Sequence, residues 1–98
     1  MNEVYAFLKK NSTFYLATDE GGQPRVRPFG AIAMFEGKLY IITSNQKDVY
    51  KQMMKNPKVE LSTMDADGTW LRVAAEAVTD GRREARAHML EENPMLKN

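Results

Sequence analysis

Three lysines recur at every fourth position of the stretch TSNQKDVYKQMMKNP: Lys47, Lys51 and Lys55. Residues four apart lie on one face of a helix, so the three ammonium groups would form a row. Thr43 and Ser44 stand before the row and bring two hydroxyl groups to the start of that helix. A helix N-terminus carries free N–H groups and a partial positive charge, and it can bind a phosphate. The stretch therefore has two interpretations: one wall of an anion site, or an ordinary solvated helix face.

Lys47 favours the anion site, because it falls in the first turn of the predicted helix. The helix dipole disfavours a cation there by a few tenths of a kcal/mol unless an anion lies nearby. Asn45 is the predicted N-cap, and Asp48 occupies the capping-box position three residues later, where Glu or Gln is more usual. The sequence thus predicts a helix whose start could accept an anion.

Two pairs of residues on predicted strands offer further contacts. Arg25 and Arg27 alternate along PRVRPFG, so both point to one face and could clamp a phosphate in bidentate fashion, or simply lie exposed. Trp70 and Arg72 share one face of a later strand. The tryptophan either belongs to the core, as a lone large aromatic residue commonly does, or stacks on a flat heterocycle beside the arginine.

The composition excludes most self-sufficient catalytic centres. The 98 residues include no cysteine and one histidine, His88, which excludes thiolate nucleophiles, disulfides and multi-histidine metal sites within one chain. His88 is interpreted as a surface residue without a chemical role. No Ser–His–Asp arrangement and no paired carboxylates can be assembled. If the protein catalyses a reaction, a bound cofactor must carry it, and the sequence identifies no catalytic residue.

The charge and hydropathy of the chain limit its partners. A net charge of +1 gives no general affinity for nucleic acid. No apolar run approaches the roughly 20 residues needed to cross a bilayer, so no membrane contact is expected. The start MNEVYAFLKK lacks the apolar core of an export signal. We therefore expect a soluble, cytoplasmic protein.

Hydrophobic periodicity and turn residues predict three helices and five strands in this order: helix 2–10, strand 14–18, strand 25–35, strand 38–44, helix 46–55, strand 58–65, strand 69–80 and helix 81–92. Glu36-Gly37 is a tight hairpin signal, and Pro28 and Gly30 interrupt the long second strand at an edge, bulge or bend. Parallel βαβ units would need a helix between most strand pairs, and the order lacks them. We therefore predict a mainly β single domain, a small antiparallel barrel flanked by helices.

The segments GGQPRVRPFG, FEGKLYIITSNQKDVYKQMMKNPKVEL and GTWLRVAAEAVTD, in this order, resemble the pyridoxamine 5′-phosphate oxidase-like, FMN-binding split-barrel family over residues 14–80. The resemblance implies an antiparallel split β-barrel with a β-β-β-α-β-β-α core, spanning 1–98 as one domain that lacks the last family strand or strands. It also implies a homodimer with FMN at the interface, acting as a flavin-dependent oxidoreductase on an unknown small molecule. The substrate-binding residues of the oxidase proper have no counterpart in this sequence. The sequence does not distinguish among the family branches that reduce nitroimidazoles, use deazaflavin or handle haem.

Carried over to this chain, the family's phosphate contacts fall on the residues already singled out. The strand arginine is Arg27 or else Arg25, and the groups at the helix start are Thr43, Ser44, Lys47 and Lys51. The segment 28–31, which includes Pro28, Phe29 and Gly30, would pass beside the flavin ring, where glycine allows a close approach. Trp70 and Arg72, on the fifth predicted strand, would contact the flavin of the second subunit.

Two other functions fit the same residues. A small barrel could bind single-stranded nucleic acid through a stacking platform of basic and aromatic side chains: Arg25, Arg27, Phe29, Tyr40, Trp70 and Arg72. The near-neutral charge and the acids Asp65 and Asp67 argue against this function. A split barrel that has lost its cofactor could instead serve as a dimeric interaction module, since a fold does not fix a function.

Overall fold

The computed structural model describes residues 2–11, 13–43 and 47–93. These residues form three helices and six strands, in the order α1 (Asn2–Lys10), β1 (Phe14–Glu20), β2 (Gln23–Phe29), β3 (Ala33–Phe35), β4 (Lys38–Tyr40), α2 (Asp48–Lys55), β5 (Lys58–Met64), β6 (Trp70–Glu76) and α3 (Arg83–Glu92). The predicted mainly β fold with three helices is confirmed. No helix in these ranges is long and apolar enough to cross a membrane.

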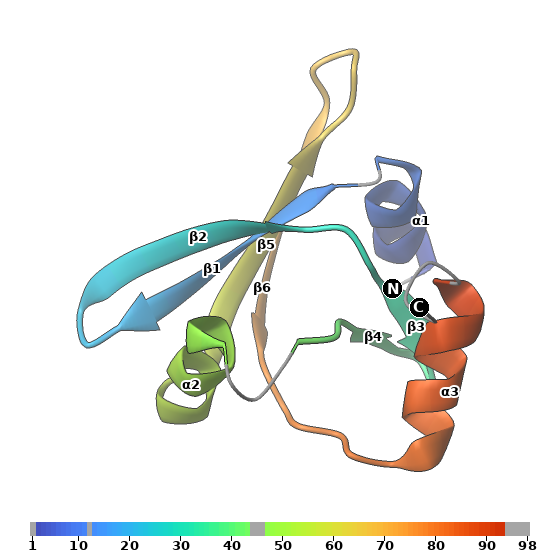
Figure 1. The fold of residues 1–98 in the computed structure, drawn as a ribbon. Helices are drawn as coiled ribbons and strands as arrows, with labels where there is room; N and C mark the ends of the chain where they lie inside the picture. Colours follow the sequence, from blue (N-terminus) through green and yellow to red (C-terminus); the bar gives the residue numbers. More distant parts are fainter. Residues whose placement is uncertain (1, 12, 44–46, 94–98) are drawn as a thin grey trace.

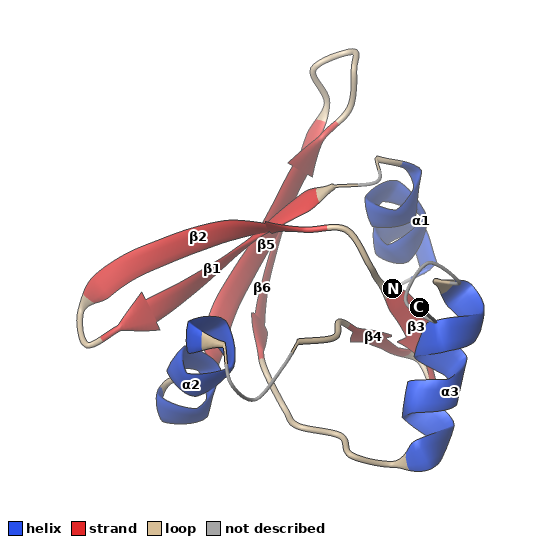
Figure 2. Ribbon diagram, in the orientation of Figure 1, coloured by secondary structure: helices blue, strands red, loops and turns tan. Residues whose placement is uncertain are grey.

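Two antiparallel sheets make up the β structure (Figure 1). Four strands pair in the order β2-β1-β5-β6, and β3 and β4 form a separate hairpin. Each pairing in the larger sheet is antiparallel, with Leu16 opposite Arg27 on one side and opposite Leu61 on the other. Figure 2 shows the three helices and the β3–β4 hairpin on one side of the larger sheet. That arrangement gives the sheet two unlike faces.

The inner face of the larger sheet carries the main core. Side chains directly opposite each other across a ladder point to the same face, so Leu16, Arg27 and Leu61 share this face. The buried members of the core come from α1, β1, the segment after β2, α2 and β5: Leu8, Phe14, Leu16, Ile32, Val49, Met53, Val59 and Leu61. The helices α1 and α2 therefore cover the inner face.

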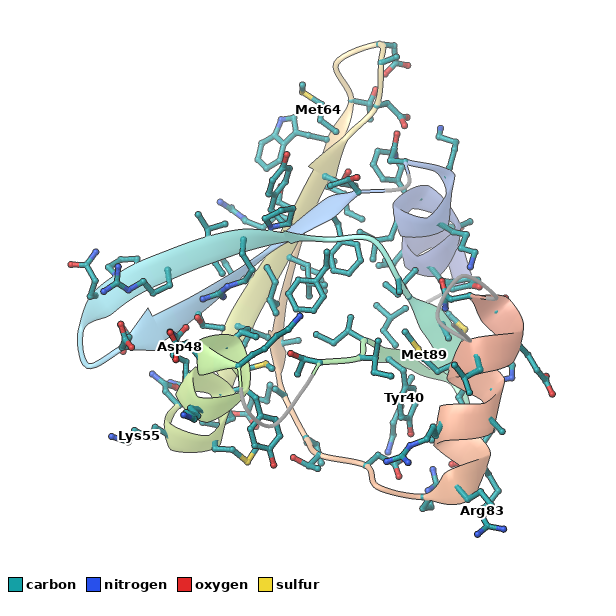
Figure 3. The ribbon with its side chains drawn as sticks, in the orientation of Figure 1. Tyr40, Asp48, Lys55, Met64, Arg83 and Met89 are labelled. Atoms are coloured by element: carbon teal, nitrogen blue, oxygen red, sulfur yellow. The ribbon has the colours of Figure 1, made fainter. Side chains whose placement is uncertain are left out.

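The outer face is largely uncovered. Four large apolar side chains there remain at least half exposed: Tyr15 at 50%, Val26 at 67%, Met64 at 63% and Trp70 at 61%. The predicted alternation along β6 is confirmed, because Arg72 lies opposite Ser62, which in turn lies opposite Tyr15. In Figure 3, Met64 lies at the far end of β5 from α2.

A second, smaller cluster joins the β3–β4 hairpin to α3. Ala31, Ala33 and Met89 are buried in it, and Tyr40 packs against them, as Figure 3 shows for the labelled pair. The predicted hairpin turn is confirmed, since Glu36 and Gly37 both have positive φ angles, 53° and 77°. The hairpin and α3 therefore form a unit attached to the end of β2.

The predicted interruption at Pro28 and Gly30 is confirmed, and the predicted strand 25–35 is not a single strand. It is divided into β2 and β3, because the residues between them lose the alternation of a half-buried strand: Ala31, Ile32 and Ala33 are all buried. Ile32 packs in the main core, whereas its two neighbours pack in the smaller cluster. The chain thus passes from one core to the other directly after Gly30.

The predicted ends of other elements also shift. The strand predicted for 38–44 ends at Tyr40, and that predicted for 69–80 spans Trp70–Glu76. The helix α2 begins at Asp48, so the capping-box role of Asp48 is wrong: the N-cap is Lys47, which makes no side-chain cap. The predicted N-cap, Asn45, lies outside the described residues. Asp48 still carries its negative charge in the first turn, where the helix dipole favours it.

Candidate anion-binding site

Arg27 extends from β2 across the inner face toward α2. One terminal nitrogen of its guanidinium donates to the backbone oxygen of Leu16, at 3.1 Å, and to Oγ1 of Thr18, at 2.8 Å. The other donates to Oε1 of Gln52 on α2, at 2.7 Å. Three contacts from two different elements therefore fix the position of this half-buried cation.

All three partners of Arg27 are neutral. No ion pair among the described residues includes Arg27, whereas Arg25 is paired with Glu20, Nε to Oε1 at 2.9 Å. Burial and, to a smaller extent, the charge of Arg25 lower the pKa of the Arg27 guanidinium, while Glu20 acts in the opposite sense. A guanidinium has five N–H donors, and three serve these contacts. Its charge and its remaining donors suit an anion.

Gln52 and Thr18 are the buried polar residues that hold Arg27. Their exposed fractions are 7% and 5%, and the Thr18 hydroxyl also donates to Oε1 of Gln52. The amide nitrogen of Gln52 donates to Oε2 of Glu20 at 3.4 Å. Sequence reasoning missed both residues, although a glutamine beside Met53 in an apolar stripe was a usable signal. Met54, the residue after Met53, is 49% exposed.

The start of α2 supplies further groups. Thr43 is half-buried, and its Oγ1 is a buried atom that lacks a hydrogen-bond partner among the described residues. Lys47 is exposed at the N-cap, and Lys51 and Lys55 are exposed along the helix. Figure 3 labels Asp48 and Lys55 at the two ends of this helix. Ser44 lies outside the described residues.

The Arg27 contact is displaced from the helix start. Gln52 follows Lys47 by five residues, which corresponds to roughly 7.5 Å along a helix axis at about 1.5 Å per residue. Arg27 therefore touches α2 more than one turn beyond its N-cap. A ligand that contacts both Arg27 and Lys47 must lie along the side of the helix rather than only at its tip.

The segment predicted to lie beside a flat ring divides between the two faces. Phe29 belongs to the inner face and stacks on Phe14, with ring centroids 5.9 Å apart, so it is part of the packing. Pro28 and Gly30 are exposed, and Pro28 lies opposite Tyr15 on the outer face. The exposed backbone at this end of β2 is open to a ligand.

Trp70 and Arg72 lie on the outer face, away from Arg27. Arg72 lies over the indole of Trp70, 5.7 Å from the ring centroid. Within one chain, Arg27 and the Trp70–Arg72 pair point to opposite sides of the sheet. The same division separates the residues of the stacking platform considered for single-stranded nucleic acid, which therefore do not form one surface.

A surface hollow and His88 are two further features. The shallow hollow of about 380 Å³ lies along β1, β5 and β6, and its lining includes Ala17, Glu60 and also Thr18, which holds Arg27. The ring of His88 packs tilted against Phe35, with ring centroids 5.3 Å apart, and its Nε2 lies 3.6 Å from Oε1 of Glu92, beyond hydrogen-bond distance. In the described ranges, no three His, Cys, Asp or Glu side chains gather in a way that could hold a metal ion.

Comparison with known proteins places this arrangement in context. The sequence profile of the family described as pyridoxamine 5′-phosphate oxidase matches residues 1–96. None of the curated proteins matches the chain.

Several solved structures are similar to the chain. A NimC/NimA family protein from Clostridium acetobutylicum is 53% identical with a TM-score of 0.96, over 100% of this chain and 68% of that one. A candidate pyridoxamine 5′-phosphate oxidase from Lactobacillus delbrueckii is 28% identical with a TM-score of 0.71, over 95% and 79% of the two chains. The haem storage protein HutZ from Vibrio cholerae is 18% identical with a TM-score of 0.68, over 97% and 76%, which is a likeness of fold alone. The split-barrel fold predicted from the sequence is thereby confirmed.

Proposed function

The chain belongs to the pyridoxamine 5′-phosphate oxidase family, and on that premise we propose that it binds FMN and acts as a flavin-dependent oxidoreductase on a small molecule. The observation that carries the proposal is the half-buried Arg27 guanidinium, which is fixed by neutral partners alone. A buried cation is costly unless it is paired, so an anionic ligand at this point would stabilise the site. The phosphate of FMN is such a ligand.

The residues present fit the phosphate of FMN. Arg27 would donate its remaining N–H groups to the phosphate oxygens in a charge-assisted contact. The unpartnered hydroxyl of Thr43 would gain the partner it lacks among the described residues. Lys47 would extend its ammonium group along α2 toward the same charge. This role gives the lysine at the helix start a reason, because the anion offsets its unfavourable position.

The flavin supplies the redox chemistry, and the protein supplies binding and orientation. The exposed backbone at Pro28 and Gly30 would lie beside the ring system, where the missing side chain of glycine allows a close approach. The NimC/NimA family protein and the candidate oxidase among the similar structures support a role in this family's chemistry. The substrate is an unidentified small molecule.

We further propose that the protein is a homodimer with FMN at the interface. Trp70 and Arg72 point away from Arg27 of their own chain, so they could reach a flavin only when it is bound by a second subunit. The exposed apolar side chains of the outer face offer a surface for that subunit: Tyr15, Val26, Met64 and Trp70. Exposed apolar side chains gathered on one face of a sheet are typical of protein interfaces.

Titration with FMN and with riboflavin tests the proposal, because riboflavin lacks the phosphate. Arg27→Ala should weaken FMN binding by about 10- to 150-fold, the range expected when hydrogen bonds to a charged group worth about 1.5–3 kcal/mol are lost. Lys47→Ala should weaken FMN binding by only a few-fold, because the lysine is exposed. Riboflavin binding should change little in either variant.

Lys55→Ala is the matched control for the lysine variant, since Lys55 lies at the other end of the same exposed row. It should leave FMN binding unchanged. Wild-type protein that binds neither ligand would overturn the proposal and favour the dimeric interaction module without a cofactor.

A further inference from the structure

We propose that Gln52 and Thr18 keep the Arg27 guanidinium un-neutralised and so set the preference of this site for a phosphate ester over an uncharged ligand. This inference deepens the proposed function and rests on it for the identity of the flavin. Both residues act through Arg27 and are positioning residues.

Gln52 is the residue of α2 that forms a hydrogen bond with Arg27. Its Oε1 lies 2.7 Å from the guanidinium and accepts its hydrogen bond. A glutamate at this position would make the same contact and neutralise the cation as an ion pair. Glutamine has the same shape and accepts the same bond, but it brings no charge. The amide therefore positions Arg27 without neutralising its charge.

Glu20 is linked to this network through the amide of Gln52 and makes no ion pair with Arg27 among the described residues. The two carboxylate oxygens of Glu20 are engaged by Arg25, at 2.9 Å, and by the amide nitrogen of Gln52, at 3.4 Å. Because the amide nitrogen faces Glu20, the amide oxygen must face Arg27 and Thr18. Glu20 on one side, and the donors of Arg27 and Thr18 on the other, thus favour the same orientation of the amide.

Thr18 completes the arrangement from β1. Its hydroxyl accepts a hydrogen bond from Arg27 and donates one to Gln52, which uses its single donor and one of its two acceptor lone pairs. Thr18 and Gln52 are both more than nine-tenths buried, so water does not readily replace either contact. The orientation of Arg27 is therefore set inside the protein before a ligand arrives.

The consequence is a charge-selective site. A guanidinium that is already oriented and carries a full positive charge gains more from a phosphate dianion than from a neutral group. The measurable quantity is the ratio of the FMN affinity to the riboflavin affinity, because contacts to the flavin ring cancel in that ratio. A purely structural role of Gln52 and Thr18 would leave the ratio unchanged.

A pair of double variants isolates the charge at residue 52. Glu20→Gln with Gln52→Glu moves one carboxylate onto Arg27 and leaves the composition and net charge of the chain unchanged. Glu20→Gln with Gln23→Glu moves the same carboxylate across the β1–β2 hairpin, where residues 20 and 23 lie opposite each other. The two proteins differ only in which glutamine has become a glutamate.

The expected result is a fall in the FMN-to-riboflavin affinity ratio of about tenfold or more in the first double variant. In the second double variant this ratio should stay within about threefold of the wild-type ratio. Equal ratios in the two variants would overturn the inference while leaving the proposed function intact. If the first double variant does not unfold cooperatively, Thr18→Val takes its place. We expect Thr18→Val to lower the FMN-to-riboflavin affinity ratio by a smaller factor, and an unchanged ratio would contradict the inference.

Thermal unfolding with inorganic phosphate separates the inference from the flavin. Phosphate should raise the unfolding midpoint of wild-type protein above that in chloride at equal ionic strength, and Gln52→Glu should lose this rise. If wild type binds no FMN but shows this behaviour, the proposed cofactor is wrong and the inference stands. If phosphate has no effect and FMN does not bind, both are wrong.

Discussion

Tyr15→Glu is predicted to dissociate the proposed dimer. Tyr15 lies in the middle of the outer face, between Pro28 on β2 and Ser62 on β5, and 50% of it is exposed. Its neighbours on that face include other exposed apolar side chains. A charge placed at this point would have to be buried without a partner in the interface, which is costly.

The size of the effect follows from the exposed area. A tyrosine side chain presents about 200 Å² when fully exposed, so half exposure leaves about 100 Å² for an interface to cover. At about 25 cal/mol per Å², loss of that burial costs about 2.5 kcal/mol per subunit and about 5 kcal/mol in a symmetric dimer. Because each 1.4 kcal/mol is tenfold, the dissociation constant should rise by about three to four decades.

Sedimentation velocity across a range of protein concentrations measures this change. Wild type should sediment as a dimer at micromolar concentration and Tyr15→Glu as a monomer. Met54→Glu is the matched control, because Met54 is 49% exposed but lies on α2 rather than on the outer face. It should remain dimeric. A monomeric wild type, or a dimeric Tyr15→Glu protein, would refute the reasoning.

Two further predictions concern the framework around the site. Asn93 is 1% exposed and donates to the backbone oxygen of Ile32 at 3.0 Å, so Asn93→Ala should cost about 1–3 kcal/mol of the free energy of unfolding; an unchanged urea midpoint would contradict this role. Contacts with Arg82 and Tyr40 hold the pKa of Asp80 well below its usual value. A carboxyl group whose pKa is lowered by folding stabilises the protein fully above its unfolded pKa, about 3.9, and loses this contribution as the pH falls through its folded pKa. Thermal unfolding below pH 4 should therefore depend less steeply on pH in Asp80→Asn than in wild type, and equal slopes would count against the Asp80–Arg82 contact.

Local signals in the sequence were sufficient for most of the fold. The hairpin turn at Glu36-Gly37 and the end of α2 at Asn56-Pro57 were predicted because a few adjacent residues determine them. The break after Gly30 was not predicted as a change of sheet. The break occurs because Ile32 packs in the main core while Ala31 and Ala33 pack in the smaller cluster. The local sequence pattern does not reveal that two separate clusters exist.

The candidate site was only partly predictable for the same reason. The basic residues could be found by type and spacing, but the three partners of Arg27 lie 9, 11 and 25 residues away in sequence. The separation of Trp70 from Arg27 depends on the register of β1, β2, β5 and β6 together. Since a shift of one residue in any pairing reverses the face, the alternation within one strand could not reveal it.

Phosphorus NMR of FMN added to the protein tests most directly whether Arg27 holds the phosphate. A free phosphate monoester loses its second proton with a pKa of about 6, and an adjacent guanidinium favours the dianion. Bound FMN should therefore keep the chemical shift of the dianion from pH 8 down to about 5, whereas in Arg27→Ala the resonance should titrate closer to 6. Two results with wild-type protein would contradict the account: a resonance of bound FMN that titrates with the pKa of free FMN, or no resonance of bound FMN at all.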